Sequence, residues 1–217
     1  MGLFAKRLGW FVERGKRSHP GQEKSRHMPF PPKTLLRVER LEERTLLSVS
    51  AAEYAEIRAA YADFGLSENM ADVNIIEIES ANLALAHLKA AITTAGTTAG
   101  DDLIVVRTTD SANTITYTDT SDEITIHINS TTYGKLNIVG FGTKSLTLNA
   151  AQKSRVINIT AGTVHLGNLT VTGGVASHGG GIYNFGQLNI SQSSIIGNFS
   201  FTSCGGIYNS GTASLAN

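Results

Sequence analysis

The 217-residue sequence contains one cysteine, Cys204. A single thiol can form neither an internal disulfide nor a cysteine cluster that binds a metal. The sequence also lacks a run of about 18–20 apolar residues, which a membrane-spanning helix requires. Met1-Gly2 is not followed by Ser or Thr at position 6, as an N-myristoylation signal would be. We therefore expect no disulfide framework, no transmembrane segment and no N-myristoylation.

Charged residues are scarce and unevenly distributed. They make up 17% of the chain, and residues 124–217 contain neither Asp nor Glu. The net charge is zero, but residues 1–45 hold 11 Lys/Arg and 5 Asp/Glu, which leaves 7 and 13 for the rest. With 41% hydrophobic residues and 22 glycines, the composition favours a folded chain with many turns over global disorder.

Residues 1–49 predict a disordered basic leader, because basic residues alternate there with Gly, Ser and Pro and no apolar period is sustained. The apolar run Leu46–Val49 is shorter than the roughly 7–15 residues of a signal-peptide core. The charge could act by electrostatic binding to an anionic surface or a nucleic acid. Five acidic residues dilute it and no nucleic-acid motif accompanies it, so we expect no specific nucleic-acid partner.

One element of the leader resembles a known export element. LEERTLLS (Leu41–Ser48) is similar to the LExRxLLS-type element near the N-terminus of many large exported bacterial surface proteins, which often carry long basic leaders. The resemblance implies a chain that is exported and lies at the cell surface, in association with the outer membrane, or outside the cell. An amphipathic helix with its charges in water is the alternative interpretation of the same residues.

Residues 50–100 predict a helical and capping segment. Ser50–Glu53 has the spacing of a capping box, in which the serine side chain and the glutamate satisfy each other's backbone N–H groups. Tyr54, Ile57 and Tyr61 then fall on one helical face.

A strand and a second helix follow in the same segment. Val73–Glu79 favours a strand. Leu85, Leu88 and Ile92 recur at the helical period, and Gly96 ends that pattern. From residue 101 onward the chain consists of short alternating runs rich in Thr, Ile, Val and Asn, which predict strands at fairly even spacing.

An internal repeat of about 25 residues organises residues 101–217. The segment Gly162–Leu166 aligns with Gly186–Ile190 after a shift of 24 and with Gly211–Leu215 after a further 25. In the same register Val171 falls on Ile195, Gly173 on Gly197, and Cys204 on Gly179. A unit of this length cannot bury its own apolar face, so successive units are expected to stack as a coil of short parallel strands.

The pentapeptide Gly-Gly-Ile-Tyr-Asn occurs twice in this repeat and predicts how side chains stack. The two-residue period of a strand places Ile182, Asn184, Leu188 and Ile190 inward and Tyr183 outward. Asn184 would then lie beneath Asn209, where amide side chains can form a hydrogen-bonded ladder. Tyr183 and Tyr208 would form an outward column that could contact a glycan, or that only steadies adjacent coils.

The repeat also resembles a known family. GGGIYN, GxLxI and SxIxGN elements within residues 155–198 are similar to the right-handed parallel β-helix repeats of bacterial exported surface proteins. The looser polymorphic outer-membrane repeats differ, because this chain has GGIY in place of GGAI and no FxxN. The resemblance implies a mostly β fold, a right-handed single-stranded parallel β-helix of the pectate-lyase type, with an N-terminal capping helix.

Enzymes of that fold depend on carboxylates. Pectate lyases hold Ca²⁺ with acidic oxygens, and the related hydrolases place carboxylates across the scissile bond. Because residues 124–217 have none, we predict a non-catalytic surface or secreted protein, adhesin-like or structural in the envelope, with no catalytic, cofactor or metal residues. The alternative is a piece of a polysaccharide lyase or hydrolase whose active turns lie beyond residue 217.

Two residue sets remain as site candidates in the coil region. The acidic residues around residues 101–123 could hold Ca²⁺, but their spacing matches no calcium loop and solvated turns are the ordinary explanation. These are Asp101, Asp102, Asp110, Asp119, Asp122 and Glu123. His127, His165 and His178 have no carboxylate or cysteine ligand set nearby, and we expect them at exposed strand or loop positions rather than in catalytic roles.

The sequence ends at Asn217, where a further strand and corner would be due. This predicts a truncated coil with an open C-terminal edge, which could associate end to end with a second copy. A carbohydrate or another cell-surface ligand is the other partner expected.

Overall fold

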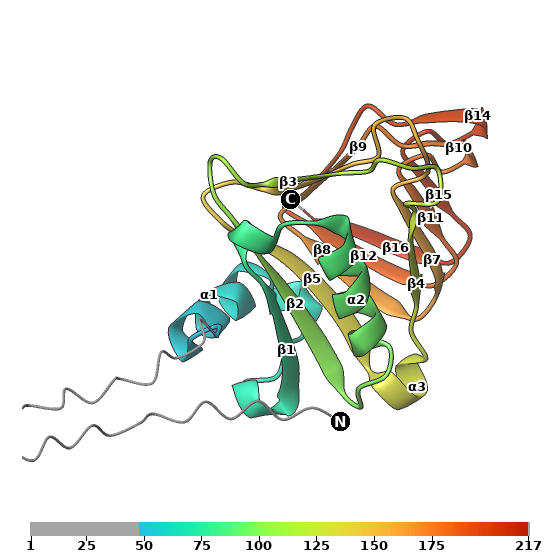
Figure 1. The fold of residues 1–217 in the computed structure, drawn as a ribbon. Coiled ribbons are helices and arrows are strands. Elements are labelled where there is room, and N and C mark those ends of the chain that lie inside the picture. The colour runs from blue at the N-terminus through green and yellow to red at the C-terminus, as the bar shows by residue number, and fades with distance from the viewer. Residues whose placement is uncertain (1–47, 217) are drawn as a thin grey trace, which may run out of the picture. The chain divides into compact units, whose positions relative to one another are not determined.

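The computed structural model describes residues 48–216. Our expectations for the leader, which are its disorder, its export element and its binding to anionic partners, therefore lie outside the described residues. The described part is mostly β, and all of its strand pairs are parallel (Figure 1).

The strands form four parallel sheets. The long sheet runs in the order β1 (Val73–Ile78), β2 (Asp101–Thr108), β5 (Lys135–Gly142), β8 (Thr163–Gly167), β12 (Gln187–Ser191) and β16 (Thr212–Ala216). A second sheet contains β4 (Ile124–His127), β7 (Ile157–Ala161), β11 (Ile182–Asn184) and β15 (Ile207–Asn209). A third contains β3 (Thr114–Thr116), β6 (Leu146–Asn149), β9 (Leu169–Thr172) and β13 (Ser194–Ile195). The last is a pair, β10 (Val175–His178) with β14 (Phe199–Ser203).

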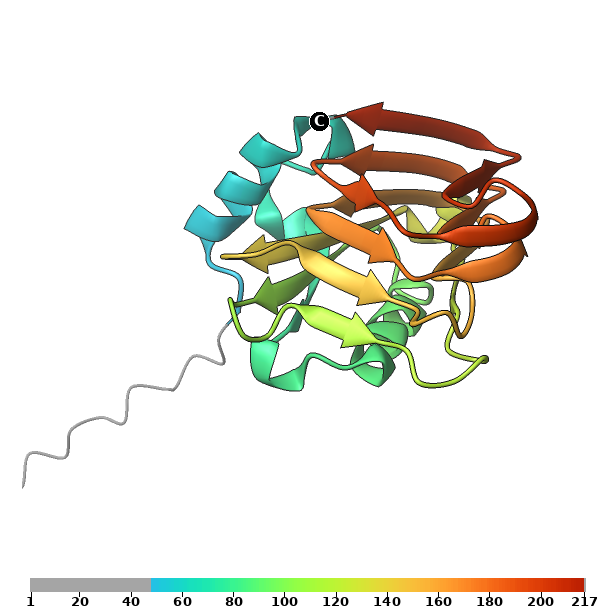
Figure 2. The same ribbon diagram turned by 90° about the horizontal axis from the view of Figure 1, so that it is seen from above.

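The chain visits these sheets in turn and comes back to the long sheet. It runs from β2 through β3 and β4 to β5, and then repeats this circuit, so that each pass lies on the previous one (Figure 2). We call each pass a coil. In the third and fourth coils, which start at β8 and β12, the strands β10 and β14 add a further side.

The strand register confirms the repeat that the sequence predicts. Leu188 of β12 pairs with Val164 on one side and with Ala213 on the other. Ile195 pairs with Val171. Equivalent residues of successive repeats therefore lie above one another, as the separations of 24 and 25 residues require.

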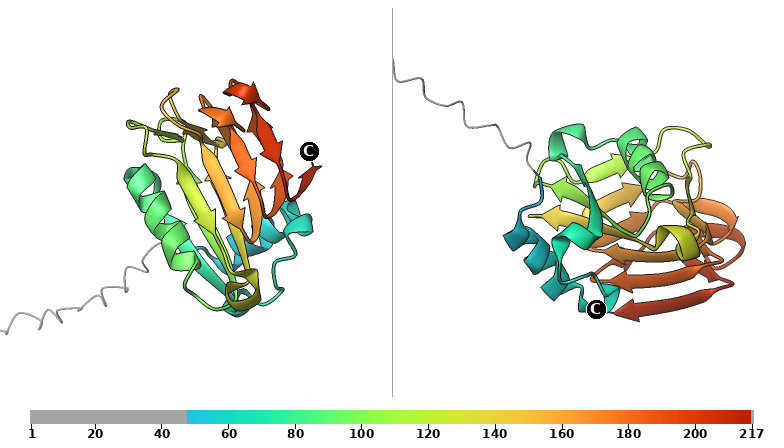
Figure 3. Two further views of the ribbon diagram at one scale, coloured as in Figure 1. Left: turned by 90° about the vertical axis from the view of Figure 1, so that its right-hand side faces the viewer. Right: turned by 90° about the horizontal axis from the view of Figure 1, so that it is seen from below.

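The coil interior holds the main hydrophobic core. The expected inward set, Ile182, Asn184, Leu188 and Ile190, is buried. Aliphatic side chains from all three longer sheets meet there and are joined by α2 (Leu85–Ala95). Figure 3 shows α2 against the first strands, at the opposite end of the stack from β16. This helix packs over the coil interior at that end, where the capping helix was expected.

A second layer covers the outer face of the long sheet. It contains α1 (Ala51–Ala60) and the short turn η1 (Ala62–Phe64), and it buries Tyr54, Ile57, Tyr61 and Phe64 against strand residues such as Val139. The capping box at Ser50 is present, because Glu53 N–H donates to the Ser50 hydroxyl and Glu53 accepts from Ser50 N–H. The helical segment therefore has two roles, with α2 closing the coil end and α1 lying on the sheet.

Two features differ from the expected division at residue 101. β1 pairs with β2 over six residues, so the long sheet begins inside the segment expected to be a cap. A four-residue helix, α3 (Ser130–Tyr133), interrupts the connection from β4 to β5. Two further 3₁₀ turns, η2 (Met70–Asp72) and η3 (Ser80–Asn82), flank β1.

Candidate functional site

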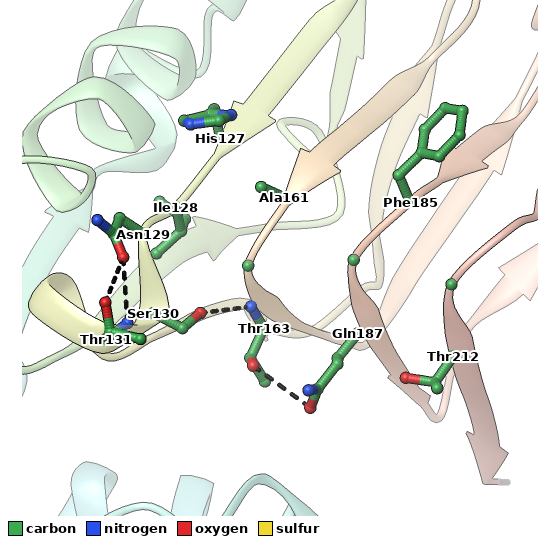
Figure 4. Close-up of a pocket in the computed structure, with 13 residues that line it drawn as sticks. His127, Ile128, Asn129, Ser130, Thr131, Ala161, Thr163, Phe185, Gln187 and Thr212 are labelled. Atoms are coloured by element: carbon green, nitrogen blue, oxygen red, sulfur yellow. Dashed lines mark hydrogen bonds between the residues drawn. The ribbon is translucent and has the colours of Figure 1, made fainter.

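A groove runs along the corner at which each coil enters the long sheet. We call it the corner groove, and its volume is about 490 Å³. Thirteen residues line it: His127, Ile128, Asn129, Ser130, Thr131, Ala161, Gly162, Thr163, Phe185, Gly186, Gln187, Gly211 and Thr212 (Figure 4). They come from four successive corners of the stack, so the groove exists only because the repeats are stacked.

Stacked glycines form the floor of the corner groove. Gly162, Gly186 and Gly211 occupy the same place in three consecutive repeats. A Cβ at Gly186 would overlap the carbonyl oxygen of Gly162, and a Cβ at Gly211 would overlap that of Gly186. Only glycine lets the coils approach this closely, and the floor is therefore bare backbone.

The short helix α3 forms one wall. Asn129 Oδ1 accepts from the Thr131 backbone N–H at 3.3 Å and from the Thr131 hydroxyl at 2.6 Å, which fixes the start of the helix. The Ser130 hydroxyl oxygen accepts from Thr163 N–H at 2.8 Å. That bond ties the wall to β8.

Uncharged polar side chains line the groove in register. Thr163, Gln187 and Thr212 are direct partners across β8, β12 and β16. The Thr163 hydroxyl donates to Gln187 Oε1 at 3.5 Å. Within residues 48–216, the Gln187 and Asn129 amide N–H₂ groups donate to no protein acceptor. These donors remain free for a bound molecule.

One aromatic ring closes the opposite side. The Phe185 side chain is 49% exposed although phenylalanine is among the most buried residue types. The Tyr183 ring meets Phe185 edge to face, with 4.7 Å between ring centroids. Phe185 thus has a supported position and an exposed face.

The two tyrosines expected as an outward column do stack. Tyr183 and Tyr208 are direct partners on β11 and β15, and their ring centroids are 4.9 Å apart. The Arg155 guanidinium lies 4.6 Å from the Tyr183 centroid. Arg155 precedes β7, which pairs with β11 on the side away from β15, so both faces of the Tyr183 ring are occupied. Tyr183 is therefore closed to stacking by a sugar, and the column joins coils.

Asn184 and Asn209 also take the expected places. Asn184 Nδ2 donates to Asn209 Oδ1 at 2.7 Å, and Asn184 is fully buried. It also donates to the Thr212 carbonyl at 2.9 Å, while its Oδ1 accepts from Gly186 N–H at 3.0 Å. This side chain consequently fixes the corner from which the groove floor is built.

The acidic residues expected as a Ca²⁺ alternative do not converge. Within residues 48–216 no three side chains of His, Cys, Asp or Glu come together as a metal site. Asp101 binds Lys135, whose Nζ is 3.3 Å from its carboxylate. Glu123 pairs with Arg155 at 2.7 Å and accepts from the Asn158 amide at 2.9 Å.

The other acidic residues also have internal partners. Asp122 accepts from the backbone N–H groups of Thr118 and Asp119, and these bonds lower the pKa of its carboxyl. Asp110 accepts from the Thr143 hydroxyl at 3.1 Å. Asp102 was expected in a solvated turn, but it is 1% exposed at the start of β2, where burial raises its pKa and the Thr98 hydroxyl donates to it at 2.6 Å.

The expectation of an exposed His165 is wrong. The α1–η1 layer covers it, with Phe64 4.9 Å from its ring, and the side chain is 7% exposed. Its Nδ1 is 2.9 Å from Asn137 Oδ1. Burial lowers the pKa of His165 to about 4. His127 is exposed, as expected, and His178 is half-buried with its ring against Tyr208.

Sequence reasoning did not find the corner groove. The repeat aligns its floor glycines with one another, but nothing in the sequence groups Phe185, Gln187 and Asn129, because they come from different coils. Among residues 48–216, none of the helices is sufficiently long and apolar to cross a membrane. Comparisons of the chain with models of protein families, with curated proteins and with solved structures found no match.

Proposed function

We propose that the chain is a non-catalytic exported protein, adhesin-like or structural in the envelope, built on a right-handed single-stranded parallel β-helix. The observation that carries the proposal is which groups the carboxylates of residues 101–123 bind. Asp101, Asp110 and Glu123 are bound to basic or polar side chains of later coils. These acids fasten one coil to the next, and they do not face a common cleft.

Coil-to-coil contacts of several kinds support the scaffold role. Asn184 bonds to Asn209, Tyr183 stacks between Arg155 and Tyr208, and the long sheet continues through six strands. Such contacts make a coil rigid along its axis. The right hand of the coil is proposed because parallel strands in one sheet are joined by right-handed crossovers in about 98% of cases.

Export is proposed from the resemblance of Leu41–Ser48 to an export element, together with the β-helix type of repeat. The test is to express the chain with a C-terminal epitope tag in a Gram-negative host and to treat intact cells with a protease. If the chain is displayed at the cell surface, the protease is expected to remove the tag from intact cells. A tag that is degraded only after lysis contradicts surface display, and the medium fraction then separates secretion from retention inside the cell.

The non-catalytic part of the proposal has its own assay. Purified protein is incubated with polygalacturonate and with neutral polysaccharides, each with and without Ca²⁺, and reducing ends and unsaturated products are measured. We expect no product above that of heat-denatured protein. Turnover of either polymer would favour a lyase or hydrolase.

We also propose that a second copy is a partner at the β16 edge. Within residues 48–216, β16 is paired on one side only, to β12, and Leu215 is 65% exposed although it continues the inward stack of Leu166 and Ile190. An open strand edge with apolar neighbours is a template for pairing. Light scattering is expected to show a concentration-dependent dimer, and a clean monomer at all concentrations contradicts this.

A further inference from the structure

We infer that the corner groove is a binding site for a neutral oligosaccharide. The inference deepens the proposed function and rests on it for its biological setting, since an adhesin-like scaffold needs a ligand. Its physical basis is the combination of a bare backbone floor, one exposed aromatic ring and a row of uncharged donors and acceptors. None of these features belongs to the column of Tyr183 and Tyr208, for which the sequence left open a glycan contact or a stack that only steadies adjacent coils.

The size and composition of the groove fit a small ligand. Its volume of about 490 Å³ lies in the range of roughly 300–1,000 Å³ that is usual for ligand pockets. Such pockets combine apolar and aromatic surface with a few well-placed polar groups. Here Phe185 and Ala161 supply the apolar and aromatic surface, and the Asn129, Gln187 and Thr212 side chains supply the polar groups.

Phe185 is positioned as a platform. Its exposed ring is supported at the edge by Tyr183, which is itself held between Arg155 and Tyr208. A rigid aromatic ring buries apolar area at a low entropic cost on binding. The C–H face of a sugar ring is a flat apolar surface that matches such a platform.

The polar row matches sugar hydroxyl groups. Thr163, Gln187 and Thr212 repeat at the strand-to-strand spacing of about 4.8 Å, so they present hydrogen-bonding groups in a line across the coils. Hydroxyl and amide groups can each donate and accept, which is the requirement for a ligand whose hydroxyls also do both. The free N–H₂ group of Asn129 adds a donor at the α3 wall, and that of Gln187 adds a donor within the row itself.

The charge of the groove selects against acidic ligands. Its lining residues include no Lys, Arg, Asp or Glu, and His127 is the one titratable group among them. The Arg155 guanidinium, which lies over the Tyr183 ring, is bound to Glu123 and to the carbonyls of His178 and Gly179. Binding a carboxylated sugar would leave its charge without a partner, which is costly in a groove.

The test uses the purified chain and defined hexasaccharides of glucose, mannose, xylose and N-acetylglucosamine, with hexagalacturonate as the acidic comparator. Amide chemical shifts are followed by NMR during titration. Binding of at least one neutral hexasaccharide, with shifts centred on Gly162, Gly186 and Gly211, is the expected result. No shift with any neutral hexasaccharide at millimolar concentration, or tighter binding of hexagalacturonate, overturns the inference.

Matched variants locate the site. Phe185→Ala is expected to weaken binding about tenfold, in keeping with the loss of one aromatic contact, and Gln187→Ala by a few-fold. Phe201→Ala is the control, because Phe201 is 73% exposed on β14 and does not line the groove. If Phe185→Ala and Gln187→Ala, both folded by circular dichroism, bind as the parent does, the inference fails.

The outcome is separable from that of the proposed function. Surface display is read from protease accessibility on intact cells, and it does not depend on saccharide binding. A displayed chain that binds no neutral hexasaccharide removes the groove assignment and leaves the scaffold proposal. A chain that binds in vitro but stays inside the cell removes the proposed function and leaves the binding site.

Discussion

Asn184 donates a hydrogen bond to Asn209, 25 residues later, across the boundary between two coils. The donor side chain is fully buried, whereas the acceptor residue is exposed. The same Asn184 amide also binds the Thr212 carbonyl and accepts from Gly186 N–H. One side chain thus ties the corner of its own coil to the corner of the next.

Replacing Asn184 with Ala is expected to lower the free energy of unfolding by about 2–4 kcal/mol, because buried backbone groups lose their partners. Asn209→Ala removes the acceptor for Asn184 and the exposed bond from Asn209 Nδ2 to the Gly211 carbonyl at 3.2 Å, and it is expected to cost less than about 1 kcal/mol because the residue is exposed. Urea unfolding followed by circular dichroism measures both. Equal costs for the two variants would contradict the asymmetry described here.

The glycine floor gives a second prediction. Gly186→Ala places a Cβ on the Gly162 carbonyl, so the coils must separate, and we expect a loss of about 1–3 kcal/mol or more. Gly206→Ala is the control, because the nearest atom to its added Cβ, Ile195 Cγ2, is at 3.6 Å. That substitution is expected to be neutral or to stabilise by up to about 1 kcal/mol. Thermal unfolding distinguishes the two, and similar changes would show that the floor is not tightly packed.

Cys204 offers a stabilising substitution. It adopts a left-handed backbone with φ 61°, at the position that Gly179 fills with φ 55° in the preceding coil. A residue with a Cβ pays about 1–2 kcal/mol for this conformation. We therefore expect Cys204→Gly to raise the free energy of unfolding by about 1 kcal/mol and Cys204→Ser to leave it nearly unchanged. A loss of stability in Cys204→Gly would contradict a strained backbone at this position.

His165 predicts an acid-sensitive part of the stability. Burial, aided by Lys135 and opposed by Asp63 and Asp101, lowers its pKa from 6.5 to about 4. The unfolded chain therefore takes up the proton first as the pH falls, and the free energy of unfolding decreases between about pH 6.5 and pH 4. A shift of this size corresponds to a loss of the order of 3 kcal/mol, at about 1.4 kcal/mol per pKa unit.

The matched variant is His165→Asn, which copies the residue that occupies the same place in the flanking strands, Asn137 and Asn189. It keeps a polar partner for Asn137 and has no titratable group. Chemical denaturation from pH 7 to pH 4 should show a shallower loss of stability in the variant than in the parent. Parallel pH profiles would contradict a buried neutral His165.

Most of the architecture that the sequence predicts follows from the repeat. The alternation around Ile182 and Leu188 and the spacing of 24 and 25 residues are local signals, so the inward set and the strand register could be derived from them. The capping box at Ser50 and the helix around Leu88 and Ile92 follow from equally local patterns.

What could not be predicted depends on contacts far apart in the chain. His165 is buried by Phe64, about 100 residues earlier, and nothing in the strand around it signals that cover. The four-residue helix α3 is too short to show a period, so its part in the corner groove was invisible. Phe185 follows the inward Asn184 by one residue, and only the structure shows that its ring lines a groove.

The most direct measurement of the stacked coil is spin-label proximity. The nitroxide labels are introduced in pairs in a Cys204→Gly background. Labels at Gln187 and Thr212 occupy paired positions on adjacent strands, and labels at Thr163 and Thr212 lie two strands apart. Labels at Gln187 and Thr202 belong to different sheets. We predict that dipolar broadening decreases in that order. Broadening for the 187–212 pair that is no greater than that for the 187–202 pair would contradict the stacked coil.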